Sequence, residues 1–136
     1  MYRLSLYSLD SRYYSAMPAR DRDIQSFLPL TPAMLHTLLA LADGDKHGYA
    51  ILKEVARRTA GKVRLGPGTL YTLIKRALAD GLIVETDDRP DPALDDERRK
   101  YYRLAARGRR VAVAEIERLE SIVDLAHEMK LRPRTA

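Results

Sequence analysis

The stretch from Leu65 to Leu82 constrains the fold most, because it combines a helical repeat with a turn at each end. Its apolar residues recur at helical spacing and can bury against neighbouring helices, while polar and cationic residues fall on the opposite side. The apolar set is Leu70, Leu73, Ile74, Ala77 and Leu78, and the outer set is Thr69, Thr72, Lys75 and Arg76. A Gly-Pro-Gly turn precedes the helix, and Gly81 ends it. The pattern predicts a short helix whose polar, cationic face suits a DNA groove.

Length and composition indicate a single small domain with a hydrophobic core. The chain has 136 residues, of which 46% are hydrophobic, enough for one compact domain. Its formal net charge of +5 fits nucleic-acid binding, although many other proteins share such an excess. The absence of cysteine excludes disulfides and thiolate zinc sites and is compatible with the cytosol. No apolar run approaches the roughly 20 residues of a membrane helix, and the first residues lack a signal-peptide core, so we expect a cytoplasmic protein with no membrane partner.

Three helices are expected after a flexible beginning. Residues 1–26 mix Ser, Tyr, Arg and Asp without a sustained period, which predicts a flexible N-terminal extension, either disordered or a frayed helix. Thr31, followed by proline, supplies an N-cap for a largely buried helix over residues 31–44. A second amphipathic helix is expected over residues 47–61, closed by a glycine, and the third covers residues 68–81.

Two short strands follow the third helix. Leu82–Glu85 is a brief run rich in β-branched residues, and Arg99–Leu104 alternates, with a loop rich in Pro and Asp between them. Three helices followed by a β-hairpin is the order of a winged helix-turn-helix. We therefore predict a mainly α protein with a small β-hairpin (α+β), in which residues 27–105 form a winged helix-turn-helix domain. Tyr101 and Tyr102 alternate across the second strand, so one of them is expected in the core.

The last part of the chain predicts one long helix over residues 106–131, followed by a flexible tail at 132–136. Its apolar residues are spaced four and three apart, as in a heptad seam, so we expect a dimerisation helix. The predicted dimerisation residues are Ala112, Ile116, Leu119, Ile122, Val123 and Ala126, and Leu125 and Met129 widen the apolar surface. The residues expected to face outward are Glu115, Glu117, Arg118 and Glu120. The alternative is a helix that folds back on its own domain.

Three short motifs occur in order along the chain. They are His47-Gly48-Tyr49-Ala50-Ile51, then Gly68-Thr69-Leu70-Tyr71 with Leu73 and Gly81-Leu82-Ile83, and finally Arg99-Lys100-Tyr101-Tyr102-Arg103-Leu104 with Gly108. Their order and spacing resemble the PadR group of transcriptional regulators over about residues 31–130. The resemblance implies a homodimeric repressor that binds an inverted-repeat operator and releases it when a small molecule or stress signal arrives. Position 72, commonly proline in the group, is threonine here, which keeps a normal amide and adds a hydroxyl.

The outer face of the third helix carries side chains suited to double-stranded DNA. Its Lys and Arg can approach phosphates or guanine edges, and its threonines can donate to phosphate or contact a thymine methyl. The tyrosine hydroxyl can bond the DNA backbone. The loop at residues 87–97 is acidic and should be repelled by phosphate, so we expect the base of the wing strand to contact DNA instead of its tip. The predicted DNA-binding residues are Thr69, Tyr71, Thr72, Lys75, Arg76, Arg98, Arg99 and Lys100.

Catalytic and metal-binding patterns are missing from the sequence. The histidines show no metal-ligand spacing, and we expect His36 in the core, His47 at a helix cap or on the surface, and His127 in solvent. We therefore expect no enzyme, no cofactor and no metal. The alternative function is a dimeric winged-helix module that binds a protein partner, although a polar outer face favours DNA. A small-molecule effector is compatible with the resemblance, but the chain has no Trp on which a flat aromatic compound could stack.

Overall fold

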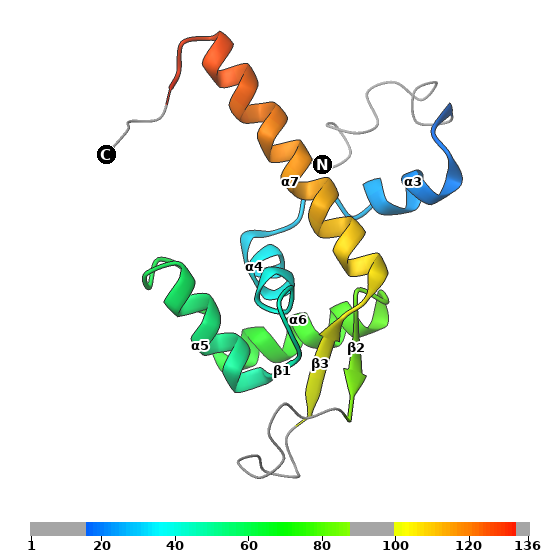
Figure 1. Cartoon of the computed structure of the whole chain (residues 1–136), viewed down its shortest axis with the longest axis vertical. Helices are drawn as coiled ribbons and strands as arrows, with labels where there is room; N and C mark the ends of the chain where they lie inside the picture. Colours follow the sequence, from blue (N-terminus) through cyan, green and yellow to red (C-terminus); the bar gives the residue numbers. More distant parts are fainter. Residues whose placement is uncertain (1–15, 88–99, 133–136) are drawn as a thin grey trace. The chain divides into compact units, whose positions relative to one another are not determined.

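The computed structural model describes residues 16–87 and 100–132 (Figure 1). The chain divides into two compact units, one of Leu30–Ala112 and one of Met1–Pro29 with Val113–Ala136. The first unit contains three helices and a small sheet, and the long helix α7 (Ala106–Glu128) begins in it. The fold class is therefore mainly helical with a small antiparallel sheet and a C-terminal helix, as predicted.

Two of the three helices in the first unit begin at side-chain caps. Helix α4 (Pro32–Ala40) starts at Thr31, whose Oγ1 accepts the Met34 N–H at 3.2 Å, as the sequence predicted. Helix α5 (Gly48–Arg58) starts at His47, whose Nδ1 accepts the Ala50 N–H at 3.1 Å. The expected capping role of His47 is confirmed. Helix α4 ends at Ala40, before the expected position, because the next three residues form a turn.

Helix α6 (Pro67–Ala79) starts at Gly66 and is followed by Gly81 with a φ of 72°, a left-handed conformation that favours glycine. Its buried residues are Leu70, Ile74 and Ala77, and they meet a core that includes Leu38, Ile51 and Val55. Leu78, expected on this buried face, is 36% exposed. It follows Ala77 by one residue, or about 100° around the helix, and so lies at the margin of the buried stripe.

The wing strands form a three-stranded antiparallel sheet in the order β1-β3-β2. Strands β2 (Ile83–Thr86) and β3 (Tyr101–Leu104) are the expected hairpin, and β1 (Lys46–His47) pairs with the free side of β3. A strand of two residues is too short to show alternation, so the sequence did not predict it. Both tyrosines of β3 are buried, at 7% and 6% exposure, where only one was expected. Strand β3 is central and both of its faces are covered at this point.

Helix α7 begins in close contact with Leu82, the residue that precedes β2. The Ala105 N–H donates to the Leu82 carbonyl at 3.0 Å, and a Cβ placed on Gly108 would lie 2.0 Å from that same oxygen. Only glycine fits here without movement of the backbone. Three and four residues after this glycine, Val111 and Ala112 are buried, at 0% and 8% exposure.

The second unit contains helix α3 (Ala19–Gln25) and the part of α7 from Val113 onward. The segment 1–26 was expected to be flexible, as a disordered stretch or a frayed helix, and its described part includes this helix, in which Ile24 is 6% exposed. The apolar signal was too sparse to show a period among the surrounding arginines and aspartates. Residues 1–15 and the predicted tail at 133–136 lie outside the described part. No helix among the described residues is long and apolar enough to cross a membrane.

Glu115 of α7 is buried, where the sequence predicted an outward-facing charge. Its side chain is 2% exposed, and its two carboxylate oxygens accept hydrogen bonds from Arg118 at 2.8 and 2.7 Å. Arg118 is itself only 13% exposed. A carboxylate can be buried when an arginine bonds both of its oxygens, which periodicity alone does not reveal.

Candidate nucleic-acid interface

The outer face of α6 is exposed to solvent, as a groove-binding helix requires. All five of its predicted DNA-binding residues lie on the surface, and Tyr71 is 61% exposed. The exposed residues are Thr69, Tyr71, Thr72, Lys75 and Arg76. The opposite face holds the helix in the core, so the two-sided pattern of the sequence corresponds to two real surfaces.

The two cations of this face are available to an external anion. Neither Lys75 nor Arg76 forms an ion pair with a residue in the described part of the chain. Exposed cations without nearby carboxylates attract phosphate over several ångströms and release counterions when they bind it. The electrostatics of α6 therefore suit a polyanion.

The hydroxyl of Thr72 is already used within the helix. It donates to the Gly68 carbonyl at 3.0 Å, so in this conformation its proton is not free for a phosphate. Its oxygen can still accept a hydrogen bond, and its methyl group can contact a thymine methyl. Of the two contacts expected for Thr72, the apolar one is favoured.

The predicted wing contacts are only partly within the described residues. Lys100 is described, with a side chain 69% exposed and its Nζ 3.7 Å from Glu85 Oε1. That distance is long and the pair is exposed, so the ammonium can exchange its partner for phosphate. Arg98 and Arg99, and most of the acidic loop, lie outside the described residues.

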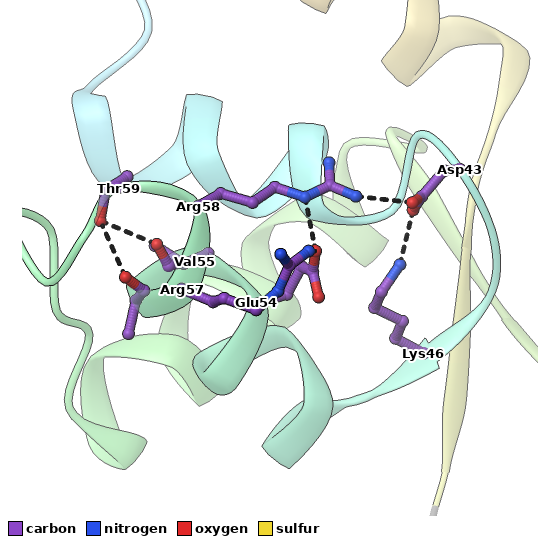
Figure 2. A network of polar contacts seen from close by, with 8 residues as sticks. Asp43, Lys46, Glu54, Val55, Arg57, Arg58 and Thr59 are labelled. Atoms are coloured by element: carbon purple, nitrogen blue, oxygen red, sulfur yellow. Dashed lines mark hydrogen bonds and ion pairs between the residues drawn. The ribbon is translucent and has the colours of Figure 1, made fainter.

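A network of ion pairs joins the turn after α4 to helix α5 (Figure 2). Asp43 accepts hydrogen bonds from Lys46 at 2.7 Å and from Arg58 at 2.6 Å, and these contacts lower the pKa of its carboxyl to about 2. Glu54 accepts from Arg57 and Arg58, and Arg57 is the larger cause of its lowered pKa. The sequence analysis missed this network, although Glu54 stands three and four residues before the arginines, a spacing that favours helix ion pairs. These cations are thus neutralised within the protein, unlike those of α6.

The residues predicted for dimerisation differ in their exposure. Ala112 is buried within its own chain, which removes it from the predicted seam, and three others are half-buried. Ile122 and Val123 are 43% and 44% exposed, and the neighbouring Leu125 and Met129 are 53% and 63% exposed. The half-buried residues are Ile116, Leu119 and Ala126. The second half of α7 therefore presents an apolar surface.

The histidines do not gather into a metal site. Within residues 16–87 and 100–132, no group of three His, Asp or Glu side chains could hold a metal ion. His36 is half-buried at the edge of the core, and His127 is exposed as expected.

Three helices, one of which has an exposed cationic face, together with a wing sheet define a winged-helix DNA-binding protein. A sequence profile of the transcriptional regulator PadR-like family matches residues 37–114, more than half of the chain. The chain therefore belongs to the PadR-like family of transcriptional regulators. The members of this family are regulators of transcription, not enzymes.

The chain is similar to a curated transcriptional regulator and, in fold, to solved structures. The chain is 34% identical over 88 residues to transcriptional regulator Rv3488 of Mycobacterium tuberculosis, covering 65% of this chain and 76% of that protein. A PadR family regulator from Clostridium difficile superposes with a TM-score of 0.57 at 24% identity, over 71% of this chain and 95% of that one. BpsR of Bordetella bronchiseptica, whose DNA binding is regulated by 6-hydroxynicotinic acid, gives a TM-score of 0.53 at 24% identity, over 88% and 82% of the two chains.

Proposed function

We propose that this regulator binds an operator in double-stranded DNA with α6 in the major groove. The observation that carries the proposal is the outer face of α6, where five polar side chains are exposed and two of them are cations without carboxylate partners in the described part of the chain. Lys75 and Arg76 supply the contacts to guanine edges or phosphates, and the threonines contact thymine methyls or the backbone. Lys100, with Arg98 and Arg99, contacts the backbone from the base of the wing.

We further propose that the protein acts as a homodimer. The exposed apolar residues in the second half of α7 form a surface that a second copy would cover, which supports this assembly. Two copies related by a twofold axis present two α6 helices to half-sites about one DNA turn, roughly 10 bp, apart. The operator is accordingly an inverted repeat, and its occupation represses transcription by excluding the polymerase.

An effector that releases the operator completes the proposal. Regulation of BpsR by a small acid supports such a device in a protein of this fold. The present chain has no Trp, so an effector here would be held by aliphatic side chains and hydrogen bonds rather than by stacking on indole. Action on chromosomal DNA places the protein in the cytoplasm.

The experiment begins with selection of duplexes from a randomised library by the purified protein. Binding of the selected duplex and of an unrelated duplex is then measured by fluorescence anisotropy at two salt concentrations. We expect tight, salt-sensitive binding of the selected duplex. Lys75→Gln and Arg76→Gln should each reduce its affinity by about 10-fold or more, because one base contact contributes about 1–3 kcal/mol of discrimination.

Arg57→Gln is the matched control, since it removes one exposed cation that is already bound to Glu54. Its affinity should remain close to that of the wild type. If no duplex is enriched and none binds at low salt, DNA is not the partner. The winged unit would then serve a protein partner, for which the exposed Tyr49 and Tyr71 are the natural contacts.

A further inference from the structure

We infer that the first half of α5 makes a second DNA contact, in which Tyr49 and Lys53 bind a phosphate of the backbone beside the groove that α6 occupies. The inference rests on the proposed function and adds which part of the DNA is bound by which residues. Neither Tyr49 nor Lys53 was predicted as a site residue from the sequence. The contact positions the helix on the duplex and carries no sequence information of its own.

Tyr49 is an exposed side chain held in one orientation. It is 59% exposed, yet its ring lies nearly parallel to that of His47, at 4° and 6.4 Å between centroids. The His47 ring is itself fixed, because its Nδ1 caps α5 and because the ring makes a T-shaped contact with the buried Tyr101, with 5.3 Å between the centroids. A side chain that is already ordered loses little conformational entropy on binding. The exposed side chain of Tyr49 is therefore held in a prepared position.

Lys53 lies one helical turn after Tyr49 and on the same side of α5. Its Nζ is 5.4 Å from the centroid of the Tyr49 ring, within the range of a cation–π contact. In the described part of the chain no carboxylate pairs with Lys53, and the adjacent Glu54 is bound to Arg57 and Arg58. The hydroxyl and the ammonium thus form a donor pair with a net positive charge, which matches a phosphate group.

This donor pair is continuous with the surface of α6. A Cβ placed on Gly48, at the start of α5, would lie 3.7 Å from the hydroxyl oxygen of Tyr71 and 3.7 Å from Leu70 Cδ2. The first turns of the two helices are therefore neighbours, as Figure 1 shows for α5 and α6 beside β1. Tyr71 and Lys75 repeat on α6 the spacing of Tyr49 and Lys53 on α5. A duplex whose groove holds α6 brings one of its strands past α5.

The test uses the full-length protein, the selected duplex and the unrelated duplex, with affinities measured across a range of salt concentrations. We expect Lys53→Gln to weaken both duplexes by a similar factor, about 3- to 10-fold, and to reduce the slope of log affinity against log salt by about one. Tyr49→Phe should weaken both duplexes by about 2- to 5-fold with an unchanged slope, since it removes a neutral donor. Lys75→Gln, in contrast, should change the preference between the duplexes.

Arg57→Gln is again the control, because it removes a cation from the same helix that is paired with Glu54. Unchanged affinity and slope in Lys53→Gln, or an equal change in Arg57→Gln, would overturn the contact while leaving the role of α6 intact. A wild-type protein that binds neither duplex would overturn the proposed function and this contact with it. Circular dichroism of each variant separates a lost contact from a lost fold, which is not expected at two exposed side chains.

Discussion

At the scale of single residues, Gly108 determines how closely α7 approaches the start of β2. The carbonyl of Leu82 occupies the place of a side chain at this glycine, at 2.0 Å from an ideal Cβ. The same oxygen accepts the Ala105 N–H, so it cannot move away without loss of a hydrogen bond. The resemblance to the family pointed to this glycine, but the close backbone contact behind it required the structure.

We predict that Gly108→Ala lowers the free energy of unfolding by about 3 kcal/mol, because the added methyl group has to displace backbone. Urea unfolding followed by circular dichroism measures the change. Gly68→Ala is the control, since nothing lies within 4 Å of its Cβ position and alanine favours a helix by about 0.5–1 kcal/mol. Equal stability of the two variants would show that the contact at Gly108 is easily relaxed.

The burial and orientation of individual side chains were the features that the sequence predicted least well. The exposure of Leu78 and the burial of Glu115 depend on which neighbours cover the margin of a helix, and no repeat encodes that. The orientation of Tyr49 depends on His47, whose ring is in turn held by Tyr101. Tyr101 is far from Tyr49 in the sequence, so no local pattern reveals this arrangement. The outer residues of α6, in contrast, were predictable, because an apolar stripe fixes the position of the opposite face.

At the scale of elements, Asp43 links the turn after α4 to both β1 and α5. Its carboxyl has a pKa of about 2 instead of 3.8, chiefly because Lys46 and then Arg58 donate hydrogen bonds to it. A carboxyl whose pKa is lowered in the folded state stabilises that state fully above its unfolded pKa. The stabilisation is lost as the pH falls from about 3.8 through about 2.

We therefore predict that Asp43→Asn lowers the urea midpoint at about pH 6, and that its difference from the wild type shrinks as the pH is lowered from about 4 towards about 2. The effect should be small, because the ion pairs are exposed and screened. Asp124→Asn, at an exposed position with no ion pair to a described residue, is the control. A difference that stays constant with pH would show that Asp43 acts through its shape and not through its charge.

Helices and strands were predictable to different degrees. The helices α4, α5 and α6 were placed correctly apart from their last residues, because each has an apolar stripe and a terminal signal, such as the Thr31 cap of α4 or Gly81 after α6. Strand β1 was not, because its two residues gain their strand character only from the partner β3. The bounds of helix α3 could not be predicted for a related reason, since its seven residues bury one side chain.

At the scale of the whole molecule, the proposed dimer depends on the second half of α7. Ile122 and Val123 are each more than 40% exposed. Contact of several large apolar side chains with water is unfavourable, so a partner surface is expected to cover them. We predict that the wild type has twice the mass of one chain in solution, by size exclusion with light scattering. Ile122→Asp with Val123→Asp should give a single-chain mass and weaken operator binding by 10-fold or more, because half-sites then bind independently.

Val123→Leu keeps the surface apolar and should remain dimeric, which makes it the matched control. A wild-type mass of one chain at all concentrations would show that this surface of α7 does not join two copies. Comparison of each variant with the wild type by circular dichroism would detect a loss of helix, which is not expected at exposed positions.

The strand order β1-β3-β2 has a consequence for the chain as it is made. Strands β1 and β2 come early in the sequence, yet each pairs with β3 and not with the other. During synthesis from the N-terminus, the ribosome therefore releases both outer strands before the central one exists. The three helices of the winged unit can meet while the sheet is still unpaired, and Tyr101–Leu104 closes it afterwards. A nascent chain that stops short of residue 104 thus carries the DNA-binding helix without the wing that accompanies it.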